Sequence, residues 1–508
     1  MGLLSIGVYF INKRRRESVG ISTGNVKEIS VETDTSTIDE STELEDVVLD
    51  SSARLARESF LTRAPVISTG LDQHVPGCAR IFVRTFGCSH NVSDSEFMMG
   101  LLIKYGYTLV GSLEESDLCI FNSCTVKNPS QDAAVNLVVR AESLGKKIVV
   151  TGCVPQADQS IPMFAKASML GVGNIDSIVH VVEQTLNGNR TVLVGKSSNL
   201  PDIVSMPKIR RNKFVEIIAV STGCLGQCTY CKTKHARGDL GSYSVLDVVA
   251  RVKIAIAEGV SQIWLTSEDL GAYGLDIGSN IVELLHAVLA EIERHPQIML
   301  RMGMTNPPYM LEHAEAVATI LSHPQVFEFL HVPVQSGSNS VLLDMKREYT
   351  REDFETLVEI LQERLEHITI ATDVICGFPG ESDEDHNETI SLIEKYKFPV
   401  INISQFYPRP GTPAARMQKI STKVAKSRSL HVTRLFESYT ENDHFLNSTV
   451  NVWFDLIEPT GQIFGHTKNY TKVIIERGPG VEIEQGSQRL VKIVSIHKWD
   501  IRGVLVPL

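Results

Sequence analysis

The chain has 508 residues, too many for one core, so two to four domains are expected. Hydrophobic residues make up 43% of it and charged residues 21%, and the mean hydropathy is near zero, as is typical of a soluble globular protein. The net charge of −11 argues against a uniformly basic nucleic-acid binder, but nine acidic and no basic residues between positions 28 and 50 account for most of it. Nine cysteines, an odd number, argue against a disulfide framework and favour metal-binding thiols in a reducing compartment.

The chain begins with residues 1–76, which are rich in Ser, Thr, Asp and Glu and predict a disordered acidic tail. The apolar run Gly2–Ile11 is too short to span a bilayer, which needs about 20 residues. Its basic residues follow the run, whereas a secretory signal places them before it. We therefore expect a cytoplasmic protein, and leave open a peripheral contact with the endoplasmic reticulum membrane.

Residues 77–186 alternate between short apolar runs and helical stretches, which predicts parallel strands joined by crossover helices. The strands are predicted at 81–84, 118–122, 147–151 and 168–172, and the helices at 95–105 and 132–143. We expect an N-terminal α/β domain of Rossmann-like form here. A linker is expected over residues 187–212, where Asn, Ser, Gly and Pro accumulate.

A second alternating block covers residues 213–436, with strands predicted at 215–220, 262–266, 298–304, 327–332, 369–375 and 400–406. Six βα units predict a partial (β/α)6 barrel, in which functional groups follow the C-terminal ends of the strands. Seven Lys and Arg and no acid between 405 and 435 are compatible with a polyanion partner, although a solvated helix face is the simpler explanation of such a run. Residues 437–508 contain β-rich segments at 450–457, 470–477 and 488–497, separated by Gly/Pro turns, and predict a small all-β barrel.

The strongest chemical signal is the run Gly223-Cys-Leu-Gly-Gln-Cys-Thr-Tyr-Cys231, directly after the first predicted barrel strand. Its three thiolates, from Cys224, Cys228 and Cys231, can hold three irons of a [4Fe–4S] cube and leave the fourth iron without a protein ligand. An open position is what a catalytic metal site needs. A structural zinc site is the alternative, and would take His235 as its fourth ligand.

A second triad consists of Cys88, Cys124 and Cys153, each of which follows a predicted strand and a small residue. The carboxyl ends of parallel strands meet at one edge of a sheet, so the three thiolates are expected to converge there. They predict a second iron–sulfur cluster, again with a free iron. Three distant cysteines are otherwise more often unrelated buried thiols, and we interpret Cys78, Cys119 and Cys376 in that way because they lack this context.

The spacing and place of the first loop resemble the radical S-adenosylmethionine (SAM) superfamily, in which the unique iron binds the amino and carboxylate groups of SAM. Reductive cleavage of SAM there yields a 5′-deoxyadenosyl radical, which makes Cys224, Cys228 and Cys231 catalytic as well as metal-binding. The resemblance also implies that later strand ends hold SAM. Glu268 would meet its amino group, and the others would line the site: Gln335, Ser336, Asp373 and Gly377.

Two triads in this order, followed by a barrel and a terminal β-barrel, resemble the methylthiotransferases over residues 79–505. In that family the auxiliary cluster carries the sulfur to be donated, one SAM methylates it, and a second SAM is cleaved to the radical. The terminal barrel resembles a TRAM domain, an RNA-binding module. The resemblance implies two [4Fe–4S] clusters and SAM as cofactors, tRNA and not DNA as the nucleic-acid partner, and an electron donor.

The segments 231–238, 267–274 and 304–308 are similar to the eukaryotic and archaeal branch, which converts N6-threonylcarbamoyladenosine at position 37 of the tRNA anticodon loop to its 2-methylthio derivative. The threonylcarbamoyl group is anionic, so four basic residues are candidate partners, although they would equally offset cluster charge: Lys232, Lys234, His235 and Arg237. Methylthiolation of N6-isopentenyladenosine or of a ribosomal protein, and a non-catalytic iron–sulfur RNA-binding protein, are the alternatives.

Overall fold

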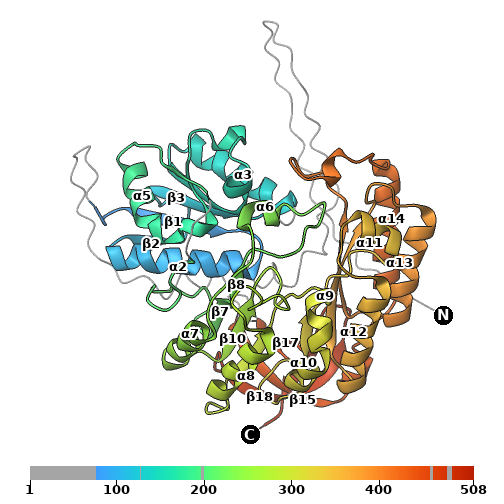
Figure 1. Ribbon diagram of the computed structural model, residues 1–508. Helices are drawn as coiled ribbons and strands as arrows, with labels where there is room; N and C mark the ends of the chain where they lie inside the picture. The colour runs from blue at the N-terminus through green and yellow to red at the C-terminus, as the bar shows by residue number, and fades with distance from the viewer. Residues whose placement is uncertain (1–75, 126–127, 196–199, 458–461, 477–482, 508) are drawn as a thin grey trace, which may run out of the picture. The chain divides into compact units, whose positions relative to one another are not determined.

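The computed structural model describes residues 76–125, 128–195, 200–457, 462–476 and 483–507 (Figure 1). The predicted acidic tail thus lies outside the described residues, apart from Pro76. Within the ranges that are described, none of the helices combines the length and the apolar composition needed to cross a membrane.

The N-terminal domain is built on a parallel sheet of six strands in the order β2-β1-β3-β4-β5-β6. The strands are β1 (Arg80–Thr85), β2 (Thr108–Val110), β3 (Leu118–Ser123), β4 (Lys147–Gly152), β5 (Ser168–Leu170) and β6 (Val192–Leu193). Helices α2 (Ser89–Tyr105), α3 (Asn128–Ser143), α4 (Cys153–Ala157) and α5 (Ile178–Leu186) lie between them in sequence (Figure 1). β3 is buried along its whole length, as expected of a central strand covered on both faces. The predicted α/β fold is confirmed.

Helix α2 begins at Ser89, six residues before the start predicted from the apolar pattern. Its first turns are polar, yet every side chain from Ser89 to Glu96 is buried. They face the next domain: the Ser93 hydroxyl donates to the carbonyl of Ile217 at 3.0 Å, and Val92 packs beside the same strand. Apolar periodicity cannot reveal a helix whose buried face is polar, so this part of α2 was missed.

The second domain has six parallel strands: β7 (Val215–Ala219), β10 (Gln262–Thr266), β11 (Met299–Met302), β12 (Phe329–His331), β13 (Thr369–Cys376) and β14 (Val400–Gln405). They form two sheets, β11-β10-β7 and β12-β13-β14, which isolated parallel bridges join at Leu300–Val326 and Met304–His331. The longer helices along this stretch are α7 (Val245–Ala257), α8 (Ile281–Ile292), α10 (Ala314–Leu321), α12 (Arg351–Arg364), α13 (Asp383–Tyr396) and α14 (Thr422–Glu437). The predicted partial barrel is therefore confirmed.

The C-terminal region is a closed barrel in the order β15-β16-β17-β19-β18. Its strands are β15 (Thr449–Ile457), β16 (Gln462–His466), β17 (Lys472–Glu476), β18 (Gln488–Ile496) and β19 (Ile501–Leu505); the sequence had suggested β15, β17 and β18 but not the two short strands β16 and β19. Trp453 of this barrel packs with Met299 and Phe329, the first residues of β11 and β12. The small barrel thus contacts the amino ends of these strands, opposite to the ends that carry functional loops.

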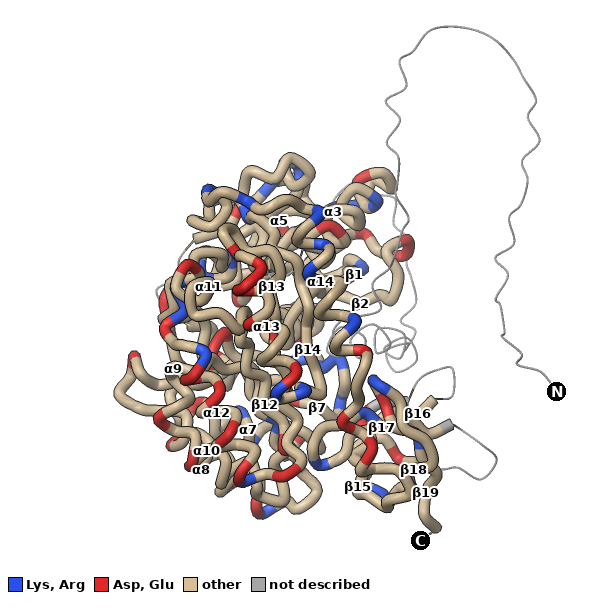
Figure 2. Tube along the Cα trace, turned by 90° about the vertical axis from the view of Figure 1, so that its right-hand side faces the viewer, with Lys and Arg blue, Asp and Glu red and all other residues tan. Residues whose placement is uncertain are grey.

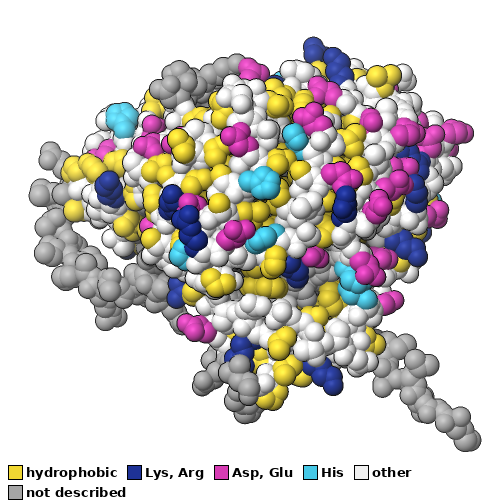
Figure 3. Space-filling view, turned by 60° about the horizontal axis from the view of Figure 1, so that its bottom comes forward, with side chains coloured by type: hydrophobic (Ala, Val, Ile, Leu, Met, Phe, Trp, Pro, Cys, Tyr) yellow, Lys and Arg dark blue, Asp and Glu magenta, His cyan; other side chains and the backbone are white. Residues whose placement is uncertain are grey.

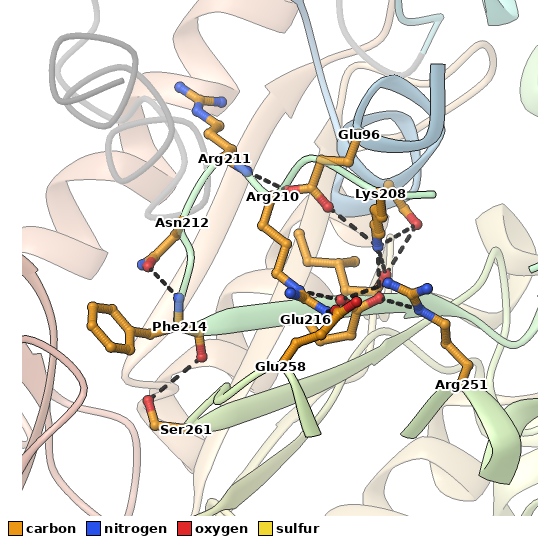
Figure 4. Close-up of polar contacts among 12 residues, drawn as sticks. Glu96, Lys208, Arg210, Arg211, Asn212, Phe214, Glu216, Arg251, Glu258 and Ser261 are labelled. Carbon is orange, nitrogen blue, oxygen red and sulfur yellow. Dashed lines mark hydrogen bonds and ion pairs between the residues drawn. The ribbon is translucent and has the colours of Figure 1, made fainter. Parts of the chain in front are cut away.

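The segment predicted as a linker is held by a buried ion network (Figure 4). Glu216 of β7 is fully buried and accepts hydrogen bonds from Lys208 at 3.0 Å and from Arg251 of α7 at 2.9 Å, and it also pairs with Arg210. Lys208 pairs in addition with Glu96 of α2 at 3.2 Å. Burial acts to raise the pKa of Glu216, but the three cations lower it to about 2. The network therefore ties α2 and the linker to the barrel.

Charged residues of both signs are spread along the chain (Figure 2) and are interspersed on the face that Figure 3 presents. Within the basic stretch 405–435, the exposed cations are Arg416, Lys419, Lys423, Lys426 and Arg434. Arg428 is buried instead, and donates to Glu381 and Asp383, each at 2.7 Å. Five of the seven cations that the sequence suggested are therefore exposed, and they form a basic surface on α14 and the segment before it.

Candidate active site

The triad of Cys88, Cys124 and Cys153, called the auxiliary triad below, lies at the carboxyl ends of three neighbouring strands. Cys88 follows β1, Cys124 follows β3 and Cys153 follows β4. The strand order reverses at β1, and ligands of open α/β sheets bind in the crevice at such a switch point. Cys88 is the N-cap residue of α2, but its side chain makes no capping hydrogen bond. The structure thus brings the three predicted cysteines to one edge of the sheet.

Glycines allow the loops of this triad to approach closely. Gly87 has φ +87°, and a Cβ there would lie 2.3 Å from the Cys124 sulfur. Gly152 has φ +91°, and a Cβ there would lie 2.2 Å from Oδ1 of Asn122. Both the backbone conformation and the space therefore require glycine.

The thiols of this triad differ in their affinity for protons. A hydrogen bond with Cys124 lowers the pKa of Cys88 to about 7, aided by the charges of Arg237 and His90 against the effect of burial. Burial raises the pKa of Cys153 to about 12, although the charge of Arg237 opposes this. Of these two thiols, Cys153 therefore holds its proton more tightly.

The triad of Cys224, Cys228 and Cys231, called the SAM triad below, lies on one loop, the SAM loop. The ends of this loop are joined by a short antiparallel pair, β8 (Ser221–Thr222) and β9 (Gly241–Ser242). A Cβ on Gly226 would lie 3.5 Å from the Cys224 sulfur and 3.8 Å from the Cys228 sulfur, so both thiols stand over one face of the loop. Burial raises the pKa of Cys224 to about 12, and the charges of Asp269 and of the other two cysteines act in the same direction. The other two thiols of the triad thus lie near enough to Cys224 for their charges to act on it.

Each triad offers three thiol donors, which fits a [4Fe–4S] cube in which every thiolate binds a different iron. For the zinc alternative, the described contacts do not bring His235 to any of these thiols. No three His, Cys, Asp or Glu side chains in the described ranges are grouped tightly enough to hold one single metal ion.

Two of the residues predicted to hold SAM carry carboxylates, one after a strand and one within a strand. Glu268 follows β10 and forms ion pairs with Nδ1 of His90 and Nε of Arg237, both at 3.0 Å. Asp373 of β13 accepts from Nδ2 of Asn402 at 2.9 Å and lies 2.8 Å from Nε2 of His331. Both carboxylates are thus positioned by neighbours, and their contact with SAM stays a prediction.

The other three residues have structural contacts of their own. Gln335 has φ +69°, and its backbone pairs with β13. The Ser336 hydroxyl accepts from the backbone of Ser338 at 3.2 Å. A Cβ on Gly377 would lie 2.4 Å from that of Ala425, so the close approach of α14 already requires this glycine. Their role toward SAM also stays a prediction.

Sequence reasoning missed two arginines beside the thiols. Arg347 donates from Nη1 to the Cys228 sulfur at 3.2 Å, although 119 positions separate the two residues. The charge of Arg409, whose pKa burial lowers, interacts with the thiols of Cys231 and Cys124, one from each triad. A single loop arginine carries no motif that would have identified it. The charge of Arg409 thus acts on one thiol of each triad.

The basic residues suggested for the threonylcarbamoyl group are largely engaged within the protein. Lys232 donates to the carbonyl of Pro410 at 2.7 Å, and Lys234 pairs with Asp239 at 3.0 Å. The guanidinium of Arg237 is buried against α2. Of these residues, Arg237 acts on the thiols themselves, since its charge lowers the pKa of Cys88 and opposes the rise in the pKa of Cys153.

Comparison with known proteins covers both cysteine domains. Residues 80–170 match the uncharacterized protein family UPF0004, and residues 218–393 match the radical SAM superfamily. A threonylcarbamoyladenosine tRNA methylthiotransferase of Xenopus laevis is 48% identical over 438 residues, which cover 85% of this chain and 78% of that protein. One of Caenorhabditis elegans is 44% identical over 356 residues, covering 69% and 82%. A solved radical S-adenosylmethionine methyltransferase from Kitasatospora setae has a TM-score of 0.49 at 16% identity, covering 66% of this chain and 74% of that one.

Each match contains one of the two triads. The match to UPF0004 contains Cys88, Cys124 and Cys153, and the match to the radical SAM superfamily contains Cys224, Cys228 and Cys231. The identity to the relatives extends over most of both partners. The chain therefore belongs to the family of threonylcarbamoyladenosine tRNA methylthiotransferases.

Proposed function

We propose that the protein converts N6-threonylcarbamoyladenosine at position 37 of tRNA to its 2-methylthio derivative by radical SAM chemistry. The observation that carries the proposal is the pair of thiol triads, which the structure brings together: Arg237, from the loop of one triad, donates to Oδ1 of Asn91 at 2.9 Å, and that oxygen lies 3.7 Å from the sulfur of Cys153 in the other. A base bound between them would meet a sulfur donor on one side and a radical source on the other. The names of the relatives support the threonylcarbamoyl substrate.

The roles of the residues follow from their places. When bound, the two [4Fe–4S] clusters and SAM supply the sulfur and the radical chemistry. Cys88, Cys124 and Cys153 would hold the auxiliary cluster, and the thiols of residues 224, 228 and 231 the other. Glu268 and Asp373, each fixed by ion pairs or hydrogen bonds, would orient SAM.

The tRNA is proposed to bind through the exposed cations of α14 and the preceding loop together with the C-terminal barrel. Five exposed Lys and Arg side chains attract the phosphate backbone without reading sequence. An external electron donor is needed to cleave SAM. We place the enzyme in the cytoplasm, which fractionation of cells expressing the full chain would test.

The test is nucleoside mass spectrometry of total tRNA from a host lacking both adenosine-37 methylthiotransferases. The intact chain is expected to yield 2-methylthio-N6-threonylcarbamoyladenosine, and the Cys224→Ala variant none. Cys88→Ala separates the two clusters: it should lose the product while the purified protein still cleaves SAM to 5′-deoxyadenosine.

Other products would change the assignment in defined ways. Methylthio-isopentenyladenosine would keep the chemistry and replace the substrate. Unchanged tRNA, with both clusters loaded and SAM cleaved, would contradict the proposal and direct attention to a protein substrate.

A further inference from the structure

A buried charge cluster lies where the two cysteine domains meet, and the proposed chemistry gives its arginine, Arg237, no role. Arg237, the last residue of α6 (Thr233–Arg237), has a side chain only 2% exposed. Asn91 and Asp94 face it from α2, and Glu268 from the end of β10. The arginine thus extends from the loop of the SAM triad to the helix whose N-cap is Cys88.

The contacts of Arg237 are specific. Its Nη2 donates to Oδ1 of Asn91 at 2.9 Å and to Oδ2 of Asp94 at 2.7 Å. Its Nε lies 3.0 Å from Oε1 of Glu268. Charge-assisted bonds of this kind, held by a planar guanidinium, fix distance and orientation together.

Asn91 carries these contacts on to the auxiliary triad. Its Nδ2 donates to the carbonyl of Phe86 at 3.0 Å and to that of Ser123 at 3.1 Å, in the loops that lead to two of the cysteines. Its Oδ1 lies 3.7 Å from the sulfur of Cys153. One amide therefore touches all three auxiliary loops, and Arg237 holds its oxygen.

We propose that Arg237 is a positioning residue that couples the two iron–sulfur sites: it holds the auxiliary triad in place against the SAM loop, and its charge raises the reduction potential of the auxiliary cluster. The proposal rests on the clusters of the proposed function but not on its RNA substrate. Reduction adds an electron to an already anionic cluster, so a buried cation beside the thiolates favours the reduced form.

The experiment uses the full chain carrying Cys224→Ala, Cys228→Ala and Cys231→Ala, so that the auxiliary cluster alone is observed. After anaerobic reconstitution, its midpoint potential is measured by redox titration with EPR detection. Arg237→Gln is expected to shift the midpoint potential to a more negative value. Arg237→Lys, which keeps the positive charge, is expected to leave the potential close to that of the parent. Asp94→Asn removes a negative charge from the same cluster and is expected to shift the potential in the opposite direction.

The matched control is Arg251→Gln, which removes another buried arginine, 3% exposed, whose described ion pair is with Glu216 and not with a cysteine. It should leave the potential unchanged. Equal potentials in the parent and Arg237→Gln, or an equal shift in Arg251→Gln, would overturn the proposal.

If Arg237→Gln cannot hold the cluster, the variants that keep the cation decide. The proposal then requires Arg237→Lys to load iron and Asp94→Asn to raise the potential, and a failure of either would contradict it. No tRNA enters these measurements, so a wrong substrate assignment would leave the result intact.

Discussion

Replacement of Glu216 by glutamine is expected to weaken the joint between the N-terminal domain and the barrel. The carboxylate is the only anion in the described contacts of Arg251, whereas Lys208 keeps Glu96 and Arg210 keeps Glu258. The amide retains the shape and loses the charge. The buried guanidinium of Arg251 is thus left without a counter-charge among its described contacts. Lys208 and Arg210 each lose one of their two anionic partners.

The magnitude follows from burial. Glu216 is 0% and Arg251 3% exposed, so solvent does not screen the loss. Removing one partner of a buried ion pair costs about 3–5 kcal/mol. The control Glu315→Gln breaks a pair with Arg364 of 2.7 Å in which both side chains are more than half exposed, and such pairs contribute about 0–1 kcal/mol.

The assay is anaerobic urea unfolding of the loaded protein, followed by tryptophan fluorescence and far-UV circular dichroism and extrapolated linearly to water. Glu216→Gln should lower the free energy of unfolding by about 3–5 kcal/mol. Glu315→Gln should lower it by about 0–1 kcal/mol. The double variant Glu216→Gln/Arg251→Met should recover part of the loss because the unpaired cation is gone. If Glu216→Gln cost no more than the control, the network would not be a stabilising joint.

Three further predictions concern the triads and one buried histidine. Gly87→Ala should lower the iron content from about eight toward four atoms per chain, because the new Cβ displaces the Cys124 sulfur. Iron and sulfide analysis measures this content, and an unchanged value would contradict the prediction. Arg347→Gln should slow SAM cleavage about tenfold or more, as 5′-deoxyadenosine release reports, because Cys228 loses a charged donor; an unchanged rate would remove Arg347 from the site. Burial and the nearby charges of His431 and Arg428 lower the pKa of His386 to about 4, so stability should be full above pH 6.5 and fall as the pH drops toward 4. His386→Gln should flatten that slope in urea unfolding, and an equal slope would refute the assignment.

The sequence alone was sufficient to place the six cysteines on their loops and to predict the strands that precede them; their role as cluster ligands stays a prediction. The strands of both sheets are short apolar runs, and each auxiliary cysteine follows such a run and a small residue, so strand order was not needed to place them at one edge. The CxxxCxxC loop is local in the chain, and local spacing is what a sequence displays. The sequence is compatible with turns at Gly87 and Gly152. It does not show that these glycines lie against Cys124 and Asn122.

Only the tertiary structure decided what lies between the triads. The polar first turns of α2 show no apolar period, yet they are buried because Asn91 and Asp94 meet Arg237 from 143 or more positions away. Arg347 and Arg409 likewise reach the thiols across long stretches of chain. A buried polar side chain is stable only with its partner, and that partner comes from another domain. Periodicity and spacing report neighbours along the chain, whereas the charges around these thiols are set by neighbours in space.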